Sequence, residues 1–180
     1  MEVSEGNNLI HKIIHQLIEQ HQLYFDFNGP PDIQIERAFQ RVESEFFVLL
    51  VKHRHDQIRL YVKIGKEENF RAGTFLKRLT AEYRCLGLTY EYFKNLPMYS
   101  AVKPISFFPE WRTIVAAEVP GVVLKPRVMS HTSMLSLRET EGLRKIVFLC
   151  GRWLRDFHQH ITDATEFELE GVAQYVSRRL

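Results

Sequence analysis

Three runs rich in strand-forming residues follow one another early in the chain, and they limit the folds that it can adopt. They cover residues 33–41, 45–52 and 58–64, and only short polar segments separate them. Connections of this length join antiparallel strands, because a parallel pair needs a crossover of about a dozen residues or more. The sequence therefore predicts an antiparallel meander of three strands.

Helices and further strands surround this meander. Residues 7–23 carry apolar side chains at helical spacing, and the Gly29-Pro30-Pro31 break ends the pattern. The expected fold class is α+β, with an antiparallel sheet of about five strands, an N-terminal helix and one long helix packed on the sheet. The predicted elements downstream are a helix, two strands and a second long helix, at residues 67–93, 101–107, 112–119 and 139–160.

The composition is that of an ordinary globular protein, with 45% hydrophobic and 26% charged residues. The 24 Lys and Arg against 22 Asp and Glu leave a net charge of +2, which argues against a strongly basic nucleic-acid binder. No apolar stretch approaches the ~20 residues of a membrane span, and the N-terminus has no secretory signal. We therefore expect a cytoplasmic protein that binds neither nucleic acid nor membrane.

The two cysteines, Cys85 and Cys150, are too few for a disulfide framework or a four-thiolate zinc site. Cys150 falls on the apolar stripe of the predicted helix at residues 139–160, so we expect it in a core. His11 and His15 have the spacing of a metal-ligand pair on a helix, but no third ligand is evident in the sequence. No metal site is predicted in this chain.

Lys63 is the first candidate functional residue. In a strand over residues 58–64, side chains alternate, so Arg59, Tyr61 and Lys63 share one face of the sheet. A lysine between apolar neighbours in a central strand is costly unless its ammonium finds an anion. An exposed strand face is the alternative, and the strand alone does not decide between the two.

Glu82 is the anion that the sequence offers. Phe75, Leu79, Glu82 and Leu86 are spaced four, three and four residues apart, so they form one stripe of a helix. A carboxylate in a stripe that packs on a sheet needs a cation. The spacing therefore predicts a pair between Lys63 and Glu82, which can orient the lysine toward nucleotide phosphates or be purely structural.

Four segments follow one another along the chain in a characteristic order: residues 60–64 (LYVKI), the helix that contains Glu82, residues 113–121 (TIVAAEVPG) and residues 151–158 (GRWLRDFH). Their order and spacing resemble the aminoglycoside phosphotransferase family, within the protein-kinase-like fold. The resemblance covers about residues 33–160. It implies a kinase-like N-terminal lobe followed by the first helices of an incomplete helical C-terminal lobe.

The resemblance implies that the chain binds ATP. Lys63 would contact the α- and β-phosphates, and Glu82 would hold Lys63 in place. Tyr61 matches the position that stacks over adenine in some members, since a purine offers its face to an aromatic ring. The Mg²⁺ that accompanies ATP would have its protein ligands outside this chain.

The resemblance also assigns residues 117–119 to the hinge between the two lobes. There the backbone C=O of Ala117 and the backbone N–H of Val119 would read the adenine edge, with Glu118 between them. Backbone recognition of this kind places little demand on the hinge side chains.

The hairpin at residues 39–45 departs from the family pattern. It contains no glycine, so the glycine-rich phosphate loop of kinases is absent. Some members of the family use a serine in this loop, which makes Ser44 a candidate for phosphate binding. The carboxylate of Glu43 beside it would repel phosphate.

The catalytic loop of the family, a His-Gly-Asp-type motif, has no match. None of the eight His residues is followed two positions later by Asp. We therefore expect residues 1–119 to form the nucleotide-binding lobe, and residues 120–180 to hold the hinge exit and the start of a truncated helical lobe. The expected parent activity is transfer of the ATP γ-phosphoryl group to a hydroxyl of a sugar- or aminoglycoside-like acceptor, with this chain inactive alone.

Two other interpretations stay open. The chain could be a non-catalytic kinase-like module that binds a nucleotide or a protein partner. It could also be an unrelated α+β interaction domain, and this reading requires Lys63 and Glu82 to lie far apart.

Overall fold

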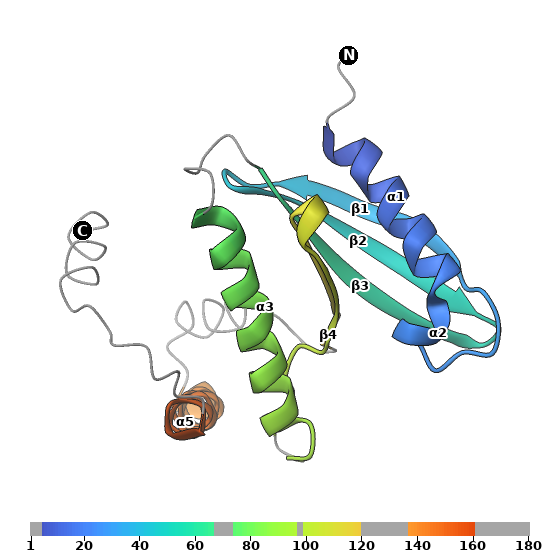
Figure 1. Cartoon of the computed structure of the whole chain (residues 1–180). Coiled ribbons are helices and arrows are strands. Elements are labelled where there is room, and N and C mark those ends of the chain that lie inside the picture. The colour runs from blue at the N-terminus through green and yellow to red at the C-terminus, as the bar shows by residue number, and fades with distance from the viewer. Residues whose placement is uncertain (1–4, 67–73, 97–98, 120–136, 161–180) are drawn as a thin grey trace. The chain divides into compact units, whose positions relative to one another are not determined.

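The computed structural model describes residues 5–66, 74–96, 99–119 and 137–160 of the chain (Figure 1). The chain divides into two compact units, Met1–Ser136 and Leu137–Leu180. The predicted lobe boundary lies between residues 119 and 120, and residue 120 is outside the described ranges. Residues 67–73, the predicted start of the 67–93 helix, are outside them as well. The elements of the first unit are α1 (Glu5–Glu19), α2 (His21–Tyr24), β1 (Asp32–Gln40), β2 (Ser44–His53), β3 (Asp56–Gly65), α3 (Thr74–Phe93), β4 (Pro104–Phe108), the 3-10 helix η2 (Pro109–Trp111) and β5 (Thr113–Ala117).

The five strands form one sheet in the order β1-β2-β3-β5-β4, and every neighbouring pair is antiparallel. The predicted three-strand meander is confirmed, with strand ends within two residues of the expected ones. β5 is inserted between β3 and β4, so α3 leads the chain from β3 past that position to the sheet edge. The α+β class and the five-stranded antiparallel sheet are therefore as predicted.

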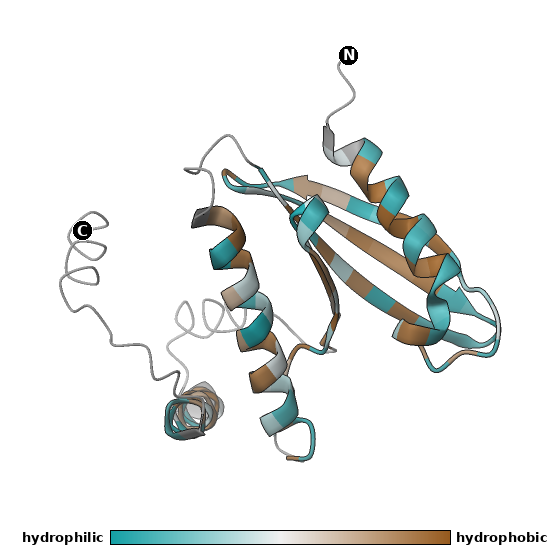
Figure 2. Cartoon of the chain, in the orientation of Figure 1, coloured by the Kyte–Doolittle hydropathy of each residue, from teal (hydrophilic) through white to brown (hydrophobic). Residues whose placement is uncertain are grey.

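The main core lies between α1 and one face of the sheet. Ile10, Ile13 and Leu17 of α1 are fully buried at helical spacing, and they pack with Leu60 and Val62 of β3. In Figure 2 the apolar residues of α1 and of the neighbouring strands are brown. The alternation predicted for β3 is confirmed, because its apolar side chains are those that this core buries.

Helix α3 packs through a second and smaller core. Phe75 and Leu79 of α3 are buried together with Ile114 of β5. Ile114 is the partner of Lys63 in the β3–β5 register, so the two side chains lie on the same face of the sheet. This is the face opposite to α1, and α3 therefore lies on the side of the sheet to which Lys63 points.

The second unit is described through one helix, α5 (Leu137–His160). The expected helix at residues 139–160 is confirmed, but the expected burial of Cys150 is wrong, because this cysteine is exposed. Val147 and Leu154 on the same stripe are 62% and 49% exposed. An apolar stripe is buried only when another element covers it, and no other element of this unit lies within the described residues. None of the described helices combines the length and apolar character needed to cross a membrane.

Candidate functional site

Lys63 and Glu82 form an ion pair that joins β3 to α3. The Lys63 Nζ lies 2.7 Å from Oε1 and 2.6 Å from Oε2 of Glu82, so the ammonium donates to both carboxylate oxygens. The two side chains are 24% and 37% exposed, which makes the pair half-open to solvent rather than buried. The contact predicted from strand alternation and helical spacing is confirmed.

We call the sheet face that carries Lys63 the Lys63 face. The β2–β3 register pairs Phe46 with Lys63, Val48 with Tyr61 and Leu50 with Arg59. Residues directly opposite each other in an antiparallel pair lie on the same side of the sheet. The middle of the Lys63 face is therefore apolar apart from the Tyr61 hydroxyl, and its β3 row carries a cation on either side of Tyr61. Its members on β2, β3 and β5 are Ser44, Phe46, Val48, Leu50, Lys52, Gln57, Arg59, Tyr61, Lys63, Gly65, Ile114 and Ala116.

Tyr61 lies in the middle of this face and is half-buried. Its hydroxyl donates to Oε1 of Glu118 at 3.5 Å, the outer limit of a hydrogen bond. Val48 beside it is fully buried and Ala116, its partner on β5, is 7% exposed. Val48 and Ala116 therefore flank Tyr61 on the two neighbouring strands.

The predicted hinge, residues 117–119, begins at the last residue of β5. The backbone N–H of Glu118 donates to the carbonyl of Arg59 at 2.8 Å, and the N–H of Ala117 donates to the carbonyl of Lys103 at 2.8 Å. The backbone of residues 117 and 118 is therefore held by β3 on one side and by the segment before β4 on the other. Val119 ends the described segment, and it is half-buried.

Arg59 links the predicted hinge to the first strand. Its Nε lies 2.7 Å from Glu36, and its Nη1 lies 3.6 Å from Glu118. The hydrogen bonds from Arg59 lower the pKa of Glu36 below its ordinary value, and Glu36 in turn raises the pKa of Arg59. Sequence reasoning missed this arrangement, because it depends on how β1 and β3 align across the sheet.

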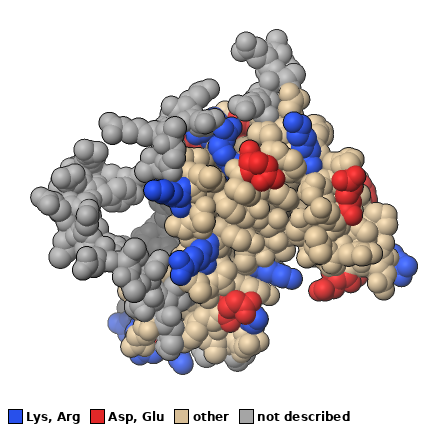
Figure 3. Space-filling view, viewed as in Figure 1, with Lys and Arg blue, Asp and Glu red and all other residues tan. Residues whose placement is uncertain are grey.

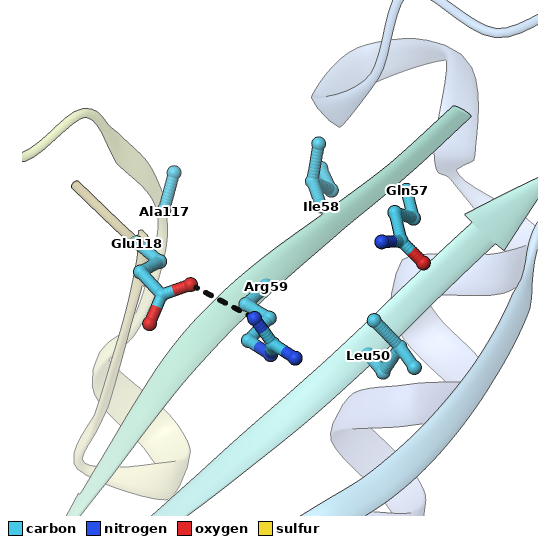
Figure 4. A pocket seen from close by; sticks show the side chains of 6 residues that line it. All are labelled: Leu50, Gln57, Ile58, Arg59, Ala117 and Glu118. Atoms are coloured by element: carbon cyan, nitrogen blue, oxygen red, sulfur yellow. Dashed lines mark ion pairs between the residues drawn. The ribbon is translucent and has the colours of Figure 1, made fainter. Parts of the chain in front are cut away.

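A hollow of about 190 Å³ opens beside Arg59 and Glu118, whose side chains point toward each other in Figure 4. It is smaller than the about 300–1,000 Å³ of a typical ligand pocket. The hollow is therefore too small for a whole ligand of that kind. Its lining residues are Leu50, Gln57, Ile58, Arg59, Ala117 and Glu118.

The hairpin between β1 and β2 turns through residues 41–43. Ser44 is the first residue of β2, is 5% exposed and stands opposite Gly65 in the register. Its carbonyl accepts the backbone N–H of Arg41 at 2.8 Å, which closes the turn. Glu43, expected to repel phosphate, pairs with Arg78 of α3 at 3.2 Å, so much of its charge is offset.

Arg41 is a second residue that sequence reasoning missed. Its guanidinium carbon lies over the ring of Phe46, 5.3 Å from the ring centroid. The ring of Phe46 also stacks on that of Phe39, with the centroids 5.1 Å apart. The available signal was the position of an arginine in a hairpin that is flanked by two aromatic residues.

The histidines and carboxylates of the described residues do not gather into a metal site. Within the described residues, no group of three or more His, Cys, Asp or Glu side chains is arranged to hold a metal ion. His15, one of the two histidines at metal-ligand spacing, instead lies 3.2 Å from Glu19 on the same helix. On the side of the molecule shown in Figure 3, acidic and basic side chains are interspersed rather than separated by sign.

Comparisons of the chain with protein-family models, with curated proteins and with solved structures found no match. The case for a function therefore rests on the geometry of the Lys63 face. Its defining features are a lysine held from a helix, a packed tyrosine and a backbone segment fixed at the end of β5.

Proposed function

We propose that the Lys63 face binds ATP, as the nucleotide-binding lobe of a small-molecule kinase that resembles the aminoglycoside phosphotransferases. The observation that carries the proposal is the pair between Lys63 and Glu82. A strand lysine held by a helix glutamate is the arrangement that kinases use to present an ammonium to nucleotide phosphates.

The topology supports the same proposal. In a kinase-like N-terminal lobe, a three-strand meander is followed by a helix and two further strands, and the chain then enters the hinge. The order β1-β2-β3-β5-β4, with α3 after β3, agrees with this scheme. An α+β interaction domain with the two residues far apart does not, because Lys63 and Glu82 are in contact.

In this proposal each part of the Lys63 face has one role. Lys63 binds the α- and β-phosphates, and Tyr61 stacks on the adenine. The backbone of Ala117 and Val119 recognises the adenine edge next to the hollow. Ser44, at the hairpin end of the face, lies on the phosphate side.

The proposed reaction of the parent enzyme is transfer of the γ-phosphoryl group to a hydroxyl of a sugar- or aminoglycoside-like acceptor. Such a transfer needs a residue that orients the acceptor hydroxyl, and the chain has no His-x-Asp motif to supply it. The described residues also provide no set of side chains for Mg²⁺. We therefore propose that residues 1–180 bind the nucleotide without turning it over, in the cytoplasm where ATP is abundant.

The missing His-x-Asp motif also favours a second candidate function. A non-catalytic kinase-like module would keep the nucleotide face, or a protein-binding surface in its place, and would lose the catalytic residues. A module that keeps the nucleotide face shares the prediction of ATP binding, and one that binds a protein partner instead does not. The two candidates differ in whether a longer chain gains transferase activity.

ATP binding tests the proposal directly. We expect ATP to perturb the amide NMR signals of β3 and of residues 113–119 in the wild-type chain, and Lys63→Ala to weaken binding by about tenfold or more. Lys12→Ala is the matched control, since Lys12 lies exposed on α1, which covers the other face of the sheet. Equal ATP affinity of Lys63→Ala and the wild type would refute the proposal.

A further inference from the structure

We propose that Arg41 is a second phosphate-binding residue, which supplies from a side chain what a glycine-rich hairpin supplies from backbone N–H groups. The inference rests on the proposed nucleotide site and specifies how its phosphate end works. Its ligand is the terminal part of a nucleoside triphosphate. Residues 39–45 contain no glycine, so this hairpin lacks the glycine-rich phosphate loop of kinases.

Arg41 lies on the same side of the sheet as Lys63. Its guanidinium lies over Phe46, and Phe46 is the direct register partner of Lys63. Partners in an antiparallel register have their Cβ atoms about 4.5–5.5 Å apart on the same face. Arg41 contacts the ring of Phe46, and Phe46 stands opposite Lys63, so Arg41 and Lys63 both lie at the hairpin end of the Lys63 face.

The contact with Phe46 leaves the hydrogen-bond donors of Arg41 available. A guanidinium that contacts an aromatic ring through its flat face keeps its N–H donors at its edges. The backbone of Arg41 is fixed as well, because its N–H donates to the Ser44 carbonyl at 2.8 Å. The side chain is thus positioned in advance, which reduces the entropy that a bound phosphate must remove.

The charges around the turn point to an anion as the partner. Glu43, the other charged residue of the turn, pairs with Arg78, and Lys63 pairs with Glu82. Within the described part of the chain, Arg41 has no carboxylate partner; its contacts are the Phe46 ring and the Ser44 carbonyl. Beside the turn, the amide of Gln40 donates to the Glu45 carboxylate and accepts from the Lys66 ammonium. The turn itself, residues 41–43, therefore carries one positive charge without a carboxylate partner, in the place where kinases hold the β- and γ-phosphates.

The test compares ligands that do and do not carry phosphates. We expect Arg41→Ala to weaken ATP and inorganic tripolyphosphate by about tenfold while adenosine affinity stays within about twofold. Arg41→Lys should keep part of the affinity, since it preserves the charge and loses the bidentate geometry. Phe46→Leu should weaken ATP by a few fold, because it removes the ring that positions Arg41 without changing any charge.

Two variants measured in parallel separate this inference from the proposed function. Lys12→Ala removes one positive charge from α1, which covers the other face of the sheet, and should bind ATP as the wild type does. If Lys63→Ala loses ATP and Arg41→Ala does not, the role of Arg41 is wrong while the nucleotide site stands. If the wild-type chain binds neither ATP nor tripolyphosphate at millimolar concentration, both are wrong. If Arg41→Ala weakens adenosine as much as ATP, the residue is structural and the inference fails.

Discussion

The ring of Phe75 lies against the Cα of Gly65, at the point where β3 ends two residues after Lys63. Phe75 belongs to the first turn of α3 and is 8% exposed. No side chain larger than hydrogen fits at residue 65 while the ring stays in place. This contact sets how closely the start of α3 approaches the sheet, and Glu82 lies two turns further along the same helix.

Gly65→Ala should therefore displace Phe75 and destabilise the chain. Its Cβ would overlap the ring, and overpacking of this kind costs about 1–3 kcal/mol. Urea unfolding measures the loss. Phe75→Leu in the Gly65→Ala background should recover part of it, and an unchanged unfolding midpoint for Gly65→Ala would contradict the contact.

Gly87→Ala, in the middle of α3, should instead stabilise the chain. A Cβ at Gly87 meets no heavy atom within 4 Å, and alanine is about 1 kcal/mol better than glycine inside a helix. We expect this variant to raise the free energy of unfolding by about 0.5–1 kcal/mol. A loss of stability would mean that α3 is not helical at this position.

Glu82→Gln should lower the stability only modestly. Because Lys63 and Glu82 are both partly exposed, their pair is expected to contribute about 0.5–1 kcal/mol rather than the about 3–5 kcal/mol of a buried pair. Glu91→Gln, which removes the exposed partner of Lys94 on the same helix, is the matched control, with a change of at most about 0.5 kcal/mol. A loss of several kcal/mol for Glu82→Gln would show that solvent does not reach the pair.

The pair between Glu36 and Arg59 should make the free energy of unfolding depend on pH in the acid range. The pKa of Glu36 is lowered in the folded chain, chiefly by the hydrogen bonds from Arg59. Its contribution is therefore complete above the ordinary glutamate pKa of about 4.3, and it is lost as the pH falls through the lower folded value. An NMR titration should show the Glu36 pKa rising toward its ordinary value in Arg59→Gln, and no rise would contradict the pair.

Much of the Lys63 site could be predicted because it depends on local periodicity. Alternation in β3 placed Lys63 away from the core, and helical spacing placed Glu82 on the packed side of α3. Short turns were enough to predict the meander. Neither inference needed any knowledge of which distant segments pair.

The parts that could not be predicted depend on long-range register. Glu36 is the extra residue of a bulge between Ile35 and Arg37, so strand alternation does not tell where its side chain lies. The insertion of β5 between β3 and β4 likewise follows from no local pattern. The predicted burial of Cys150 was wrong for another reason. An amphipathic stripe shows which side of a helix another element could cover, and it does not show whether any element does so.

The two cores described above differ greatly in size. We therefore expect different free energies of local opening for α1 and for α3. Among the described residues, thirteen buried side chains form the core between α1 and the sheet. The core under α3 has three buried side chains, with Tyr83, Leu86 and Phe107 packed against them. Segments with few buried apolar contacts exchange their amide hydrogens through local opening, well below the free energy of global unfolding. We therefore expect α3 to open from an intact sheet more readily than α1, and each such event would break the contact between Lys63 and Glu82. In the proposed nucleotide site, Lys63 is then held in place for a phosphate only in the fraction of molecules in which α3 is closed.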